Sequence, residues 1–222
     1  FGDWKQHQPG EFPSWCSKCA NEMTQEEKAA HRRHMEEAAK LREVERQKRA
    51  EIARKRAQKM WDEASPAHEH PYLSKKGING SGTRIGKDGD LLIPLKNADG
   101  EIQTLQRIRP DCEKRFLPGG LVGGHFAVIG PKKAGPIVVV EGFATGATVH
   151  KATGSTVIVA FNAGNINAVA AAIRGKYPHR DIIIAADDDK WTDGNTGVSK
   201  AREAAKEHRC AVVSPEFQSL EG

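Results

Sequence analysis

Four acidic side chains in the second half of the chain have the type and spacing for metal-dependent chemistry. They are Glu141, Asp187, Asp188 and Asp189. Each of the two groups directly follows an apolar run, at residues 137–140 and 182–186. Asp187 and Asp189 are two residues apart, so on extended backbone they point to one side, with Cα atoms about 6.6 Å apart. Converging carboxylates repel unless a cation lies among them, and hard oxygen ligands suit Mg²⁺ or Mn²⁺. The alternative is that these acids only cap helices or face water. Two separate apolar runs that both end in acids make this alternative less favoured.

The elements that must position these acids follow from the apolar runs. Residues 137–140, 155–161 and 182–186 are short and rich in β-branched residues, which is typical of buried parallel strands. Helix-length segments at 146–152 and 167–177 separate them, so the order predicts an α/β unit with a parallel sheet. Ligands bind beyond the carboxyl ends of such strands, where the four acids and Asn162 must lie.

These residues resemble the Toprim domain, which bacterial primases, type IA and type II topoisomerases and some nucleases share. The resemblance is carried by Glu141-Gly142 on one strand and Asp187-x-Asp189 on a later one. The fuller pattern adds Phe-Ala-Thr-Gly after Gly142 and the segment Ala160–Asn165, and it is similar to primases of conjugative plasmids, satellite phages and integrative elements. Replicative primases, to whose catalytic core these are related, carry an Asp four residues after the Glu. This chain has Thr145 there, so a metal site that uses that acid is not implied.

Length and charge set wider limits. The chain has 222 residues and a net charge of +5, with a pI near 9.0. It is long enough for one large domain or two small ones. A basic protein with an acidic cluster fits a polyanionic substrate, although a merely soluble basic protein has the same charge.

Cysteine usage and hydropathy indicate a compartment. Four scattered cysteines, Cys16, Cys19, Cys112 and Cys210, do not make a disulfide framework, so we expect a reducing cytoplasm, in a bacterial host as the resemblance implies. No apolar run approaches 18 residues, and we expect no membrane span. Because the sequence begins at Phe1 and ends without a clear terminal signal, we expect a piece of a longer protein.

The N-terminal segment, residues 1–23, contains one candidate zinc motif. Cys16 and Cys19 are followed by His31 and His34, close to a two-Cys two-His pattern that would bind Zn²⁺. Both later gaps are one residue short of the usual spacing. The sequence therefore favours two solvated histidines on a charged helix over a zinc site.

Residues 24–64 are predicted to form one long charged helix. Thr24-Gln-Glu-Glu27 is a capping box that starts it, and its interior has no Gly or Pro. The apolar stripe is thin and charges of both signs alternate over the rest. Such a helix either runs its basic side chains along a nucleic acid or acts as a salt-bridged spacer or partner helix.

Residues 65–134 are predicted to form a small basic subdomain. The runs 91–95 and 102–108, joined by Asn97-Ala-Asp-Gly100, indicate a hairpin. The arrangement resembles the small subdomain that precedes the Toprim domain in bacterial primases, where a basic hairpin and a downstream Lys-Tyr or Lys-Phe motif line the groove for template and nucleotide. The residues that match by position are Arg107, Arg109, Lys114, Arg115 and Phe116. Guanidinium groups bind phosphates and an aromatic ring stacks on bases. The alternative is a set of ordinary exposed strand charges.

Residues 135–222 are assigned to the Toprim domain, which also contains a late helix. Residues 198–207 are predicted to be helical, with Lys200 in the first turn and Gly197 before it. The amides of that turn are suited to bind a phosphate, and the glycine permits close approach.

The predicted fold is therefore α/β: a Toprim parallel sheet flanked by helices, preceded by a β-rich primase-like subdomain and a long charged helix. The predicted function is that of a DNA primase catalytic core, a nucleotidyltransferase that makes short RNA primers on single-stranded DNA from ribonucleoside triphosphates in phage, plasmid or mobile-element replication. The resemblance also implies a helicase module, in the same parent chain or in trans.

Roles within the acidic cluster stay open at this point. Glu141, Asp187 and Asp189 would hold metals that position the triphosphate and help activate the primer 3′-hydroxyl. Asp188 is either a further ligand or a partner of a ligand, and Glu141 is either a ligand or a general base.

Two other functions stay open as well. The same carboxylates would serve a metal-dependent nuclease, and a non-catalytic nucleic-acid-binding module of a replication protein is the third. A topoisomerase needs a tyrosine nucleophile, and neither Tyr72 nor Tyr177 lies in a recognisable nucleophile motif.

Overall fold

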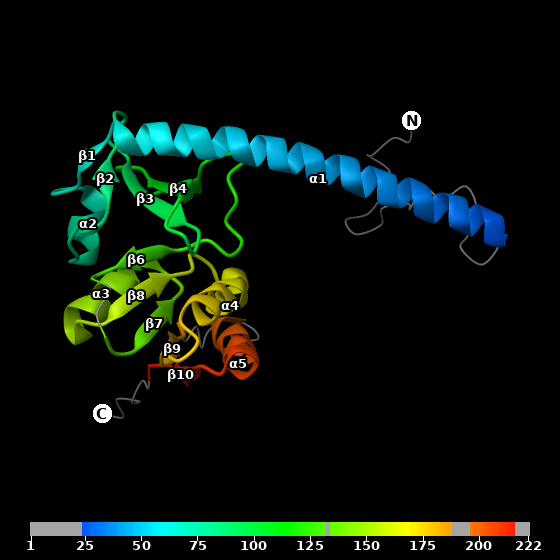
Figure 1. The fold of residues 1–222 in the computed structure, drawn as a ribbon. Helices are drawn as coiled ribbons and strands as arrows, with labels where there is room; N and C mark the ends of the chain where they lie inside the picture. The colour runs from blue at the N-terminus through cyan, green and yellow to red at the C-terminus, as the bar shows by residue number, and fades with distance from the viewer. Residues whose placement is uncertain (1–23, 132–133, 188–195, 216–222) are drawn as a thin grey trace, which may run out of the picture. The chain divides into compact units, whose positions relative to one another are not determined.

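Two five-stranded sheets and five α-helices make up the part of the chain that the computed structural model describes, residues 24–131, 134–187 and 196–215 (Figure 1). The chain divides into two units, Phe1–Gln47 and Lys48–Gly222. None of the helices in the described ranges is long and apolar enough to cross a membrane.

Helix α1, Gln25–Asp62, is the predicted long charged helix. Its capping box is formed: the amide of Glu27 donates to Thr24 Oγ1 at 3.2 Å, and the amide of Thr24 donates to Glu27 Oε2 at 2.8 Å. Ion pairs one turn apart cover its exposed surface, as between Arg46 and Glu43 at 2.7 Å. Only the last turns are buried, through Ala50, Ala53 and Ala57.

The first sheet is antiparallel throughout, in the order β1-β2-β3-β4-β5. Its strands are β1 (Ser65–Pro66), β2 (Arg84–Ile85), β3 (Leu91–Lys96), β4 (Ile102–Ile108) and β5 (Lys114–Phe116). The hairpin β3–β4 confirms the prediction, whereas the short strands β1, β2 and β5 were not predicted.

Helix α2, Pro71–Lys76, was not predicted either, although its signals are local. The His70 side chain caps it by accepting from the amide of Tyr72 at 3.1 Å, Pro71 occupies the first turn, and Gly77 ends it with φ of 63°.

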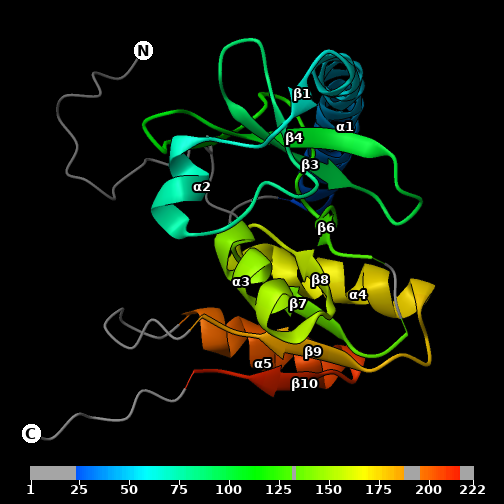
Figure 2. The ribbon, with the colours of Figure 1, turned by 90° about the vertical axis from the view of Figure 1, so that its left-hand side faces the viewer.

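The second sheet has the order β10-β9-β7-β8-β6 (Figure 2). Its strands are β6 (Ala127–Ile129), β7 (Ile137–Val140), β8 (Thr156–Val159), β9 (Ile182–Ala185) and β10 (Ala211–Val213). The last four run parallel, as predicted for β7, β8 and β9, and β6 is an antiparallel edge strand. The connecting helices are α3 (Phe143–Thr153), the 3₁₀ turn η2 (Ala163–Asn165), α4 (Ile166–Lys176) and α5 (Thr196–His208).

Alternation along β7 divides the core into two faces. Val139 and Ile137 pack with α4 and α5, whereas Val138 and Val140 pack with α3. Residues of β3 and β4, among them Ile93 and Ile108, share the cluster on the α3 side, so the first sheet is docked on this face. The other face of the first sheet is covered by the end of α1, where Ala57 packs in a third cluster.

Candidate active site

The structure brings Glu141 and Asp187 to one edge of the second sheet. Val140, at the end of β7, lies opposite Ala185 of the neighbouring parallel strand β9. Glu141 follows Val140 directly, and Asp187 lies two residues beyond Ala185, so both carboxylates extend past the carboxyl ends of adjacent strands. Both residues are half-buried. The predicted partners Asp188 and Asp189 lie outside the described residues.

Helix α5 begins against these two acids. An ideal Cβ on Gly197 would lie 2.8 Å from the carbonyl oxygen of Asp187 and 4.0 Å from Glu141 Oε2. A side chain there would collide with backbone, so glycine permits the approach of the first helical turn. The positive end of the helix dipole therefore lies beside the carboxylates, where it favours negative charge.

The donor set at this edge consists of hard oxygen ligands, which suits a divalent cation such as Mg²⁺ or Mn²⁺. Within residues 24–131, 134–187 and 196–215, no group of three or more His, Cys, Asp or Glu side chains is placed to hold a metal. Glu141 and Asp187 are thus two members of a site whose other predicted members are not described.

Phe161 follows the next strand, β8, and sequence reasoning missed it as a site residue. Its amide donates to the carbonyl oxygen of Glu141 at 2.8 Å, which places it beside the acid. Its φ is 71°, a left-handed conformation that bulky residues adopt rarely and that costs about 1–3 kcal/mol. Asn162 comes next, half-buried and extended, and its side chain does not cap η2.

The left-handed turn places the Phe161 ring against Phe116 of β5, with ring centroids 6.0 Å apart and planes inclined by 76°. Both side chains are half-buried. An aromatic pair from the two sheets therefore lies next to the Glu141 backbone. Nothing in the sequence around Ala160–Asn162 signals a left-handed phenylalanine, so this contact was not predictable.

The register of β5 divides the predicted basic groove into two faces. Lys114 lies opposite Ile108 and Phe116 opposite Gln106, so both point to the side of the first sheet that packs on the second sheet. Arg115 lies opposite Arg107, and both point to the α1 side. Only Lys114 and Phe116 of the predicted set thus face the second sheet from β5.

Lys114 is held by an aromatic ring. Its ammonium lies 5.1 Å from the ring centroid of Tyr72, within the range of a cation–π interaction. Tyr72 is 1% exposed, its hydroxyl has no hydrogen-bond partner among the described residues, and burial raises its pKa.

The three arginines of the set are engaged by acids. Arg107 donates from Nε to Asp90 Oδ2 at 2.8 Å and pairs with the same buried carboxylate through Nη2 at 2.6 Å. Arg109 and Arg115 share Glu113, at 3.2 and 2.6 Å. The hydrogen bond from Arg115, and then that from Arg109, lowers the pKa of Glu113. Arg107 therefore has a structural role through its ion pair with Asp90. The side chains of Arg109 and Arg115 remain exposed at the edge of the first sheet.

Asn165 connects a glycine-rich loop to the site and was also missed as a site residue. Its side chain is buried; it accepts from the amide of Gly124 at 2.7 Å and donates to the carbonyls of His125 at 3.0 Å and Ala160 at 2.8 Å. The loop that precedes β6 is thereby tied to the end of β8.

Two remaining predicted sites lie elsewhere. Lys200 pairs with Glu203 at 2.8 Å on the exposed face of α5. His31 and His34 are exposed on α1, whereas Cys16 and Cys19 lie outside the described residues, so the zinc alternative stays a prediction.

Comparison with known proteins finds similarity to a protein family in the second half of the chain. Residues 136–217 match the model of the Toprim domain, which confirms the resemblance predicted from Glu141-Gly142 and Asp187-x-Asp189. Most of the chain is similar to two curated proteins of Escherichia coli, both named DNA primase TraC. The first is 38% identical over 192 residues, which make up 81% of this chain and 18% of the relative. The second is 33% identical over 219 residues, which make up 94% of this chain and 15% of the relative. The chain thus spans less than a fifth of the length of these relatives.

Among solved structures, the fold is similar to the primase fragment of the bacteriophage T7 primase-helicase protein. The TM-score is 0.48 and the identity 21%, over 65% of this chain and 64% of that chain. A DNA primase domain from Pseudomonas aeruginosa gives a TM-score of 0.44 and 15% identity over 66% of this chain and 51% of that chain.

Proposed function

We propose that this chain is the catalytic core of a DNA primase, which joins ribonucleotides into short primers on single-stranded DNA. The proposal rests on two features that lie at one edge of the second sheet. Glu141 and Asp187 follow the ends of β7 and β9. The rings of Phe116 and Phe161 lie beside them. Carboxylates serve phosphoryl transfer, and an aromatic pair serves nucleobases, so together they suit a nucleotide substrate on a nucleic acid. The similarity to DNA primase TraC over most of this chain supports the same proposal.

Glu141 and Asp187, with Asp188 and Asp189, would hold a divalent cation, for which Mg²⁺ and Mn²⁺ are the proposed ions. A bound divalent cation offsets negative charge on the transferring phosphoryl group and lowers the pKa of a coordinated hydroxyl. A divalent cation fits this edge because the donors are oxygen atoms at the ends of two adjacent strands. The first turn of α5, at Gly197, lies against them. The amides of that turn would take phosphate oxygens.

The β-rich subdomain would hold the nucleic acid and the nucleotide. Lys114, positioned by the Tyr72 ring, would bind a phosphate on the side of the sheet that faces the carboxylates. Phe116 and Phe161 would offer ring surface to a base. Asn162, whose carboxamide is not used for capping, would donate to or accept from the nucleotide.

Arg109 and Arg115 would act as an outer phosphate contact. Both are exposed at the end of β4 and on β5, with side-chain exposures of 54% and 69%. A polyanion would compete with Glu113 for them, so their contribution should depend strongly on salt.

Priming by the purified chain tests the proposal. Circular single-stranded DNA, four ribonucleotides and Mg²⁺ or Mn²⁺ are supplied to the chain and to Asp187→Asn. Short labelled RNA from the first and not from the second is the expected result. Metal-dependent shortening of the DNA without RNA would replace the proposal with a nuclease, and binding of the DNA with neither product would replace it with a non-catalytic binding module.

The place of this activity in replication is part of the same proposal. A primase of a phage, plasmid or mobile element would work with a helicase, in the same parent chain or in trans, in the cytoplasm of a bacterial host. Stimulation of primer synthesis when a helicase and unwinding duplex are added is the expected result, measured with the same labelled RNA.

A further inference from the structure

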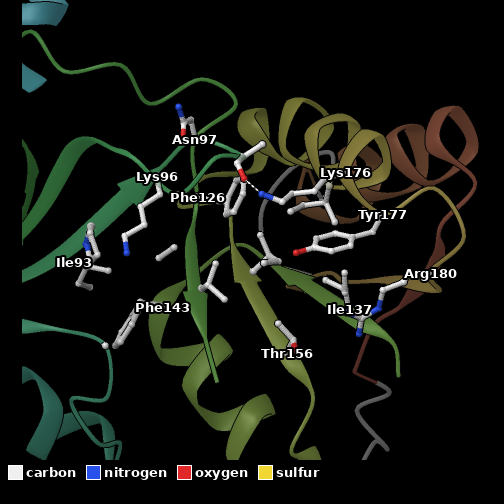
Figure 3. A pocket seen from close by; sticks show the side chains of 18 of the residues that line it. Ile93, Lys96, Asn97, Phe126, Ile137, Phe143, Thr156, Lys176, Tyr177 and Arg180 are labelled. Carbon is white, nitrogen blue, oxygen red and sulfur yellow. Dashed lines mark hydrogen bonds between the residues drawn. The ribbon is translucent and has the colours of Figure 1, made fainter. Parts of the chain in front are cut away.

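A cavity of about 280 Å³ is lined by residues of both sheets and of α4, and it reaches the amino ends of β7 and β8 (Figure 3). Ile137 and Thr156, the first residues of β7 and β8, line it, whereas Glu141 follows the last residue of β7. Among the described residues, one isolated bridge joins the two sheets, between Phe126 and Lys96, and both of these residues line the cavity. Glu141 and Asp187 are not among the residues that line it, although Phe143, two residues after Glu141, is.

The walls of the cavity are mostly apolar and come from both sheets and α4. Ile93 of β3, Phe126 before β6, Ile158 of β8 and Ile173 of α4 are among the side chains that line it. Each is a buried member of a core cluster, so the walls are held in place without a ligand. The volume is close to the lower limit of about 300 Å³ for ligand pockets, which selects a small ligand.

The charged groups around the cavity are all cationic. They are Lys96, Lys176 and Arg180, and no Asp or Glu is among the described residues that line the cavity. Lys176 donates to the carbonyl oxygen of Ala98 in the β3–β4 turn, and Arg180 donates from Nε to the carbonyl oxygen of Gly135 at 2.9 Å while its guanidinium lies 5.6 Å from the Tyr177 ring centroid. Both are thus committed to the protein.

The side chains of Lys96 and Tyr177 each present an uncommitted polar group. The ammonium of Lys96 and the hydroxyl of Tyr177 make no hydrogen bond or ion pair with any part of the chain that the structure describes. Figure 3 shows them on either side of Phe126, with the Tyr177 hydroxyl directed into the cavity. Lys96 is half-buried, and an ammonium without an acid among the described residues attracts an anion. The Tyr177 hydroxyl offers one further hydrogen bond.

We propose that this cavity binds a small amphipathic anion, an apolar body that carries one carboxylate. The apolar body lies against Phe126, Ile158 and Ile173, and the carboxylate pairs with Lys96. One uncommitted ammonium matches a single negative charge better than a phosphate dianion, for which a guanidinium fork would be expected. Tyr177 donates to an acceptor on the ligand.

Binding there would tie the two sheets together. Lys96 ends β3 of the first sheet, whereas Tyr177 follows α4 on the second, and the ligand would contact both. Because Lys114 and Phe116 belong to the first sheet and Glu141 to the second, an occupied cavity would make their relative position more rigid. The ligand would therefore raise the thermal stability of the chain and act on the active site from a distance.

Titration calorimetry with 2-naphthoate, an apolar ring system with one carboxylate, tests the proposal on the whole 222-residue chain. Its uncharged amide is the paired probe. We expect saturable binding of the acid and about tenfold weaker binding of the amide, because a hydrogen bond to a charged group is lost. Lys96→Gln should weaken acid binding by a similar factor of about ten. Tyr177→Phe should weaken it by a smaller factor, since the lost bond is neutral.

Lys151→Gln, which removes a charge from the exposed side of α3, is the control and should bind as the unaltered chain does. Isoleucine methyl resonances locate the site: those of Ile137, Ile158 and Ile173 should shift, whereas Ile108, opposite Leu91 at the other end of β3 from Lys96, should not. No saturable binding, equal binding of acid and amide, or shifts away from the cavity would each overturn the proposal. A failure of priming would leave these results unchanged, because the cavity shares no residue with the carboxylate edge.

Discussion

The rings of Phe116 and Phe161 meet edge to face across the two sheets, with centroids 6.0 Å apart. Such pairs stabilise proteins by about 0.5–1.5 kcal/mol beyond the area they bury. The contact joins β5 of the first sheet to the residue that follows β8 of the second, so it links the predicted nucleic-acid subdomain to the carboxylate edge.

A double-mutant cycle measures this link. Phe116→Leu and Phe161→Leu should each lower the free energy of unfolding, and together they should cost less than the sum of the two by about 0.5–1.5 kcal/mol. Urea unfolding of the four proteins gives the coupling energy. Strictly additive costs would show that the rings do not interact in solution.

Removal of one carboxylate should separate chemistry from binding. Asp187→Asn should lower primer synthesis by about a thousandfold, because a divalent ion supplies several kcal/mol of charge stabilisation. Binding of single-stranded DNA should remain, and the rise in melting temperature with Mg²⁺ or Mn²⁺ should disappear. Asp181→Asn is the matched control, because Asp181 precedes β9 at the end of the strand far from the site. Equal losses in the two variants would contradict a local role for Asp187.

Gly197 should tolerate no side chain. Gly197→Ala places a Cβ 2.8 Å from the carbonyl oxygen of Asp187, so α5 must move away from the acid. We expect a loss of about 1–3 kcal/mol in stability and a loss of priming activity. Gly175→Ala, in α4, has no atom within 4 Å of its new Cβ and should instead stabilise the chain by about 1 kcal/mol. Thermal unfolding and the priming assay on both variants check the pair, and an unchanged Gly197→Ala protein would refute the close approach.

The three hydrogen bonds of Asn165 should make it one of the costlier polar side chains to lose. Asn165→Ala leaves the amide of Gly124 and two carbonyls unpaired, which we expect to cost about 2–4 kcal/mol. Asn167→Ala, two residues on, removes an exposed hydrogen bond to Glu207 and should cost about 0.5 kcal/mol or less. Denaturant unfolding compares the two, and similar costs would mean that the loop is not held by Asn165.

Stability should fall in mild acid because of two histidines, the buried His70 and the half-buried His125. Burial lowers the pKa of His70 and of His125 below the ordinary value of about 6.5. Between the folded and the ordinary pKa, the unfolded chain binds more protons than the folded one. The stability that the two neutral histidines contribute is therefore fully present above about pH 6.5, and it is lost as the pH falls through their pKa values in the folded chain.

The variant His70→Asn/His125→Gln should flatten the dependence of unfolding free energy on pH below about 6.5. Asn preserves the cap of α2 that His70 now provides. His179→Gln, at an exposed position, is the control. An unchanged pH profile in the double variant would assign the acid sensitivity to other groups.

Local patterns in the sequence were enough to predict several elements. The capping box of α1, the β3–β4 hairpin and the β-branched strands β7, β8 and β9 depend on residues one to four positions apart, which the sequence displays directly. The convergence of Glu141 and Asp187 also followed, because parallel strands must end at one edge. Strand and helix boundaries differ from the predictions by a few residues, as for α3, which begins at Phe143 rather than Gly146.

The tertiary structure alone decided which side chains meet. Lys114 and Phe116 face the second sheet while Arg107 and Arg115 face α1, because a register shift of one residue between β4 and β5 would reverse every side chain. The left-handed Phe161 and the cavity beside Lys96 depend on how the two sheets pack. Such packing is a sum of many weak contacts between residues far apart in the chain, and no local pattern encodes it.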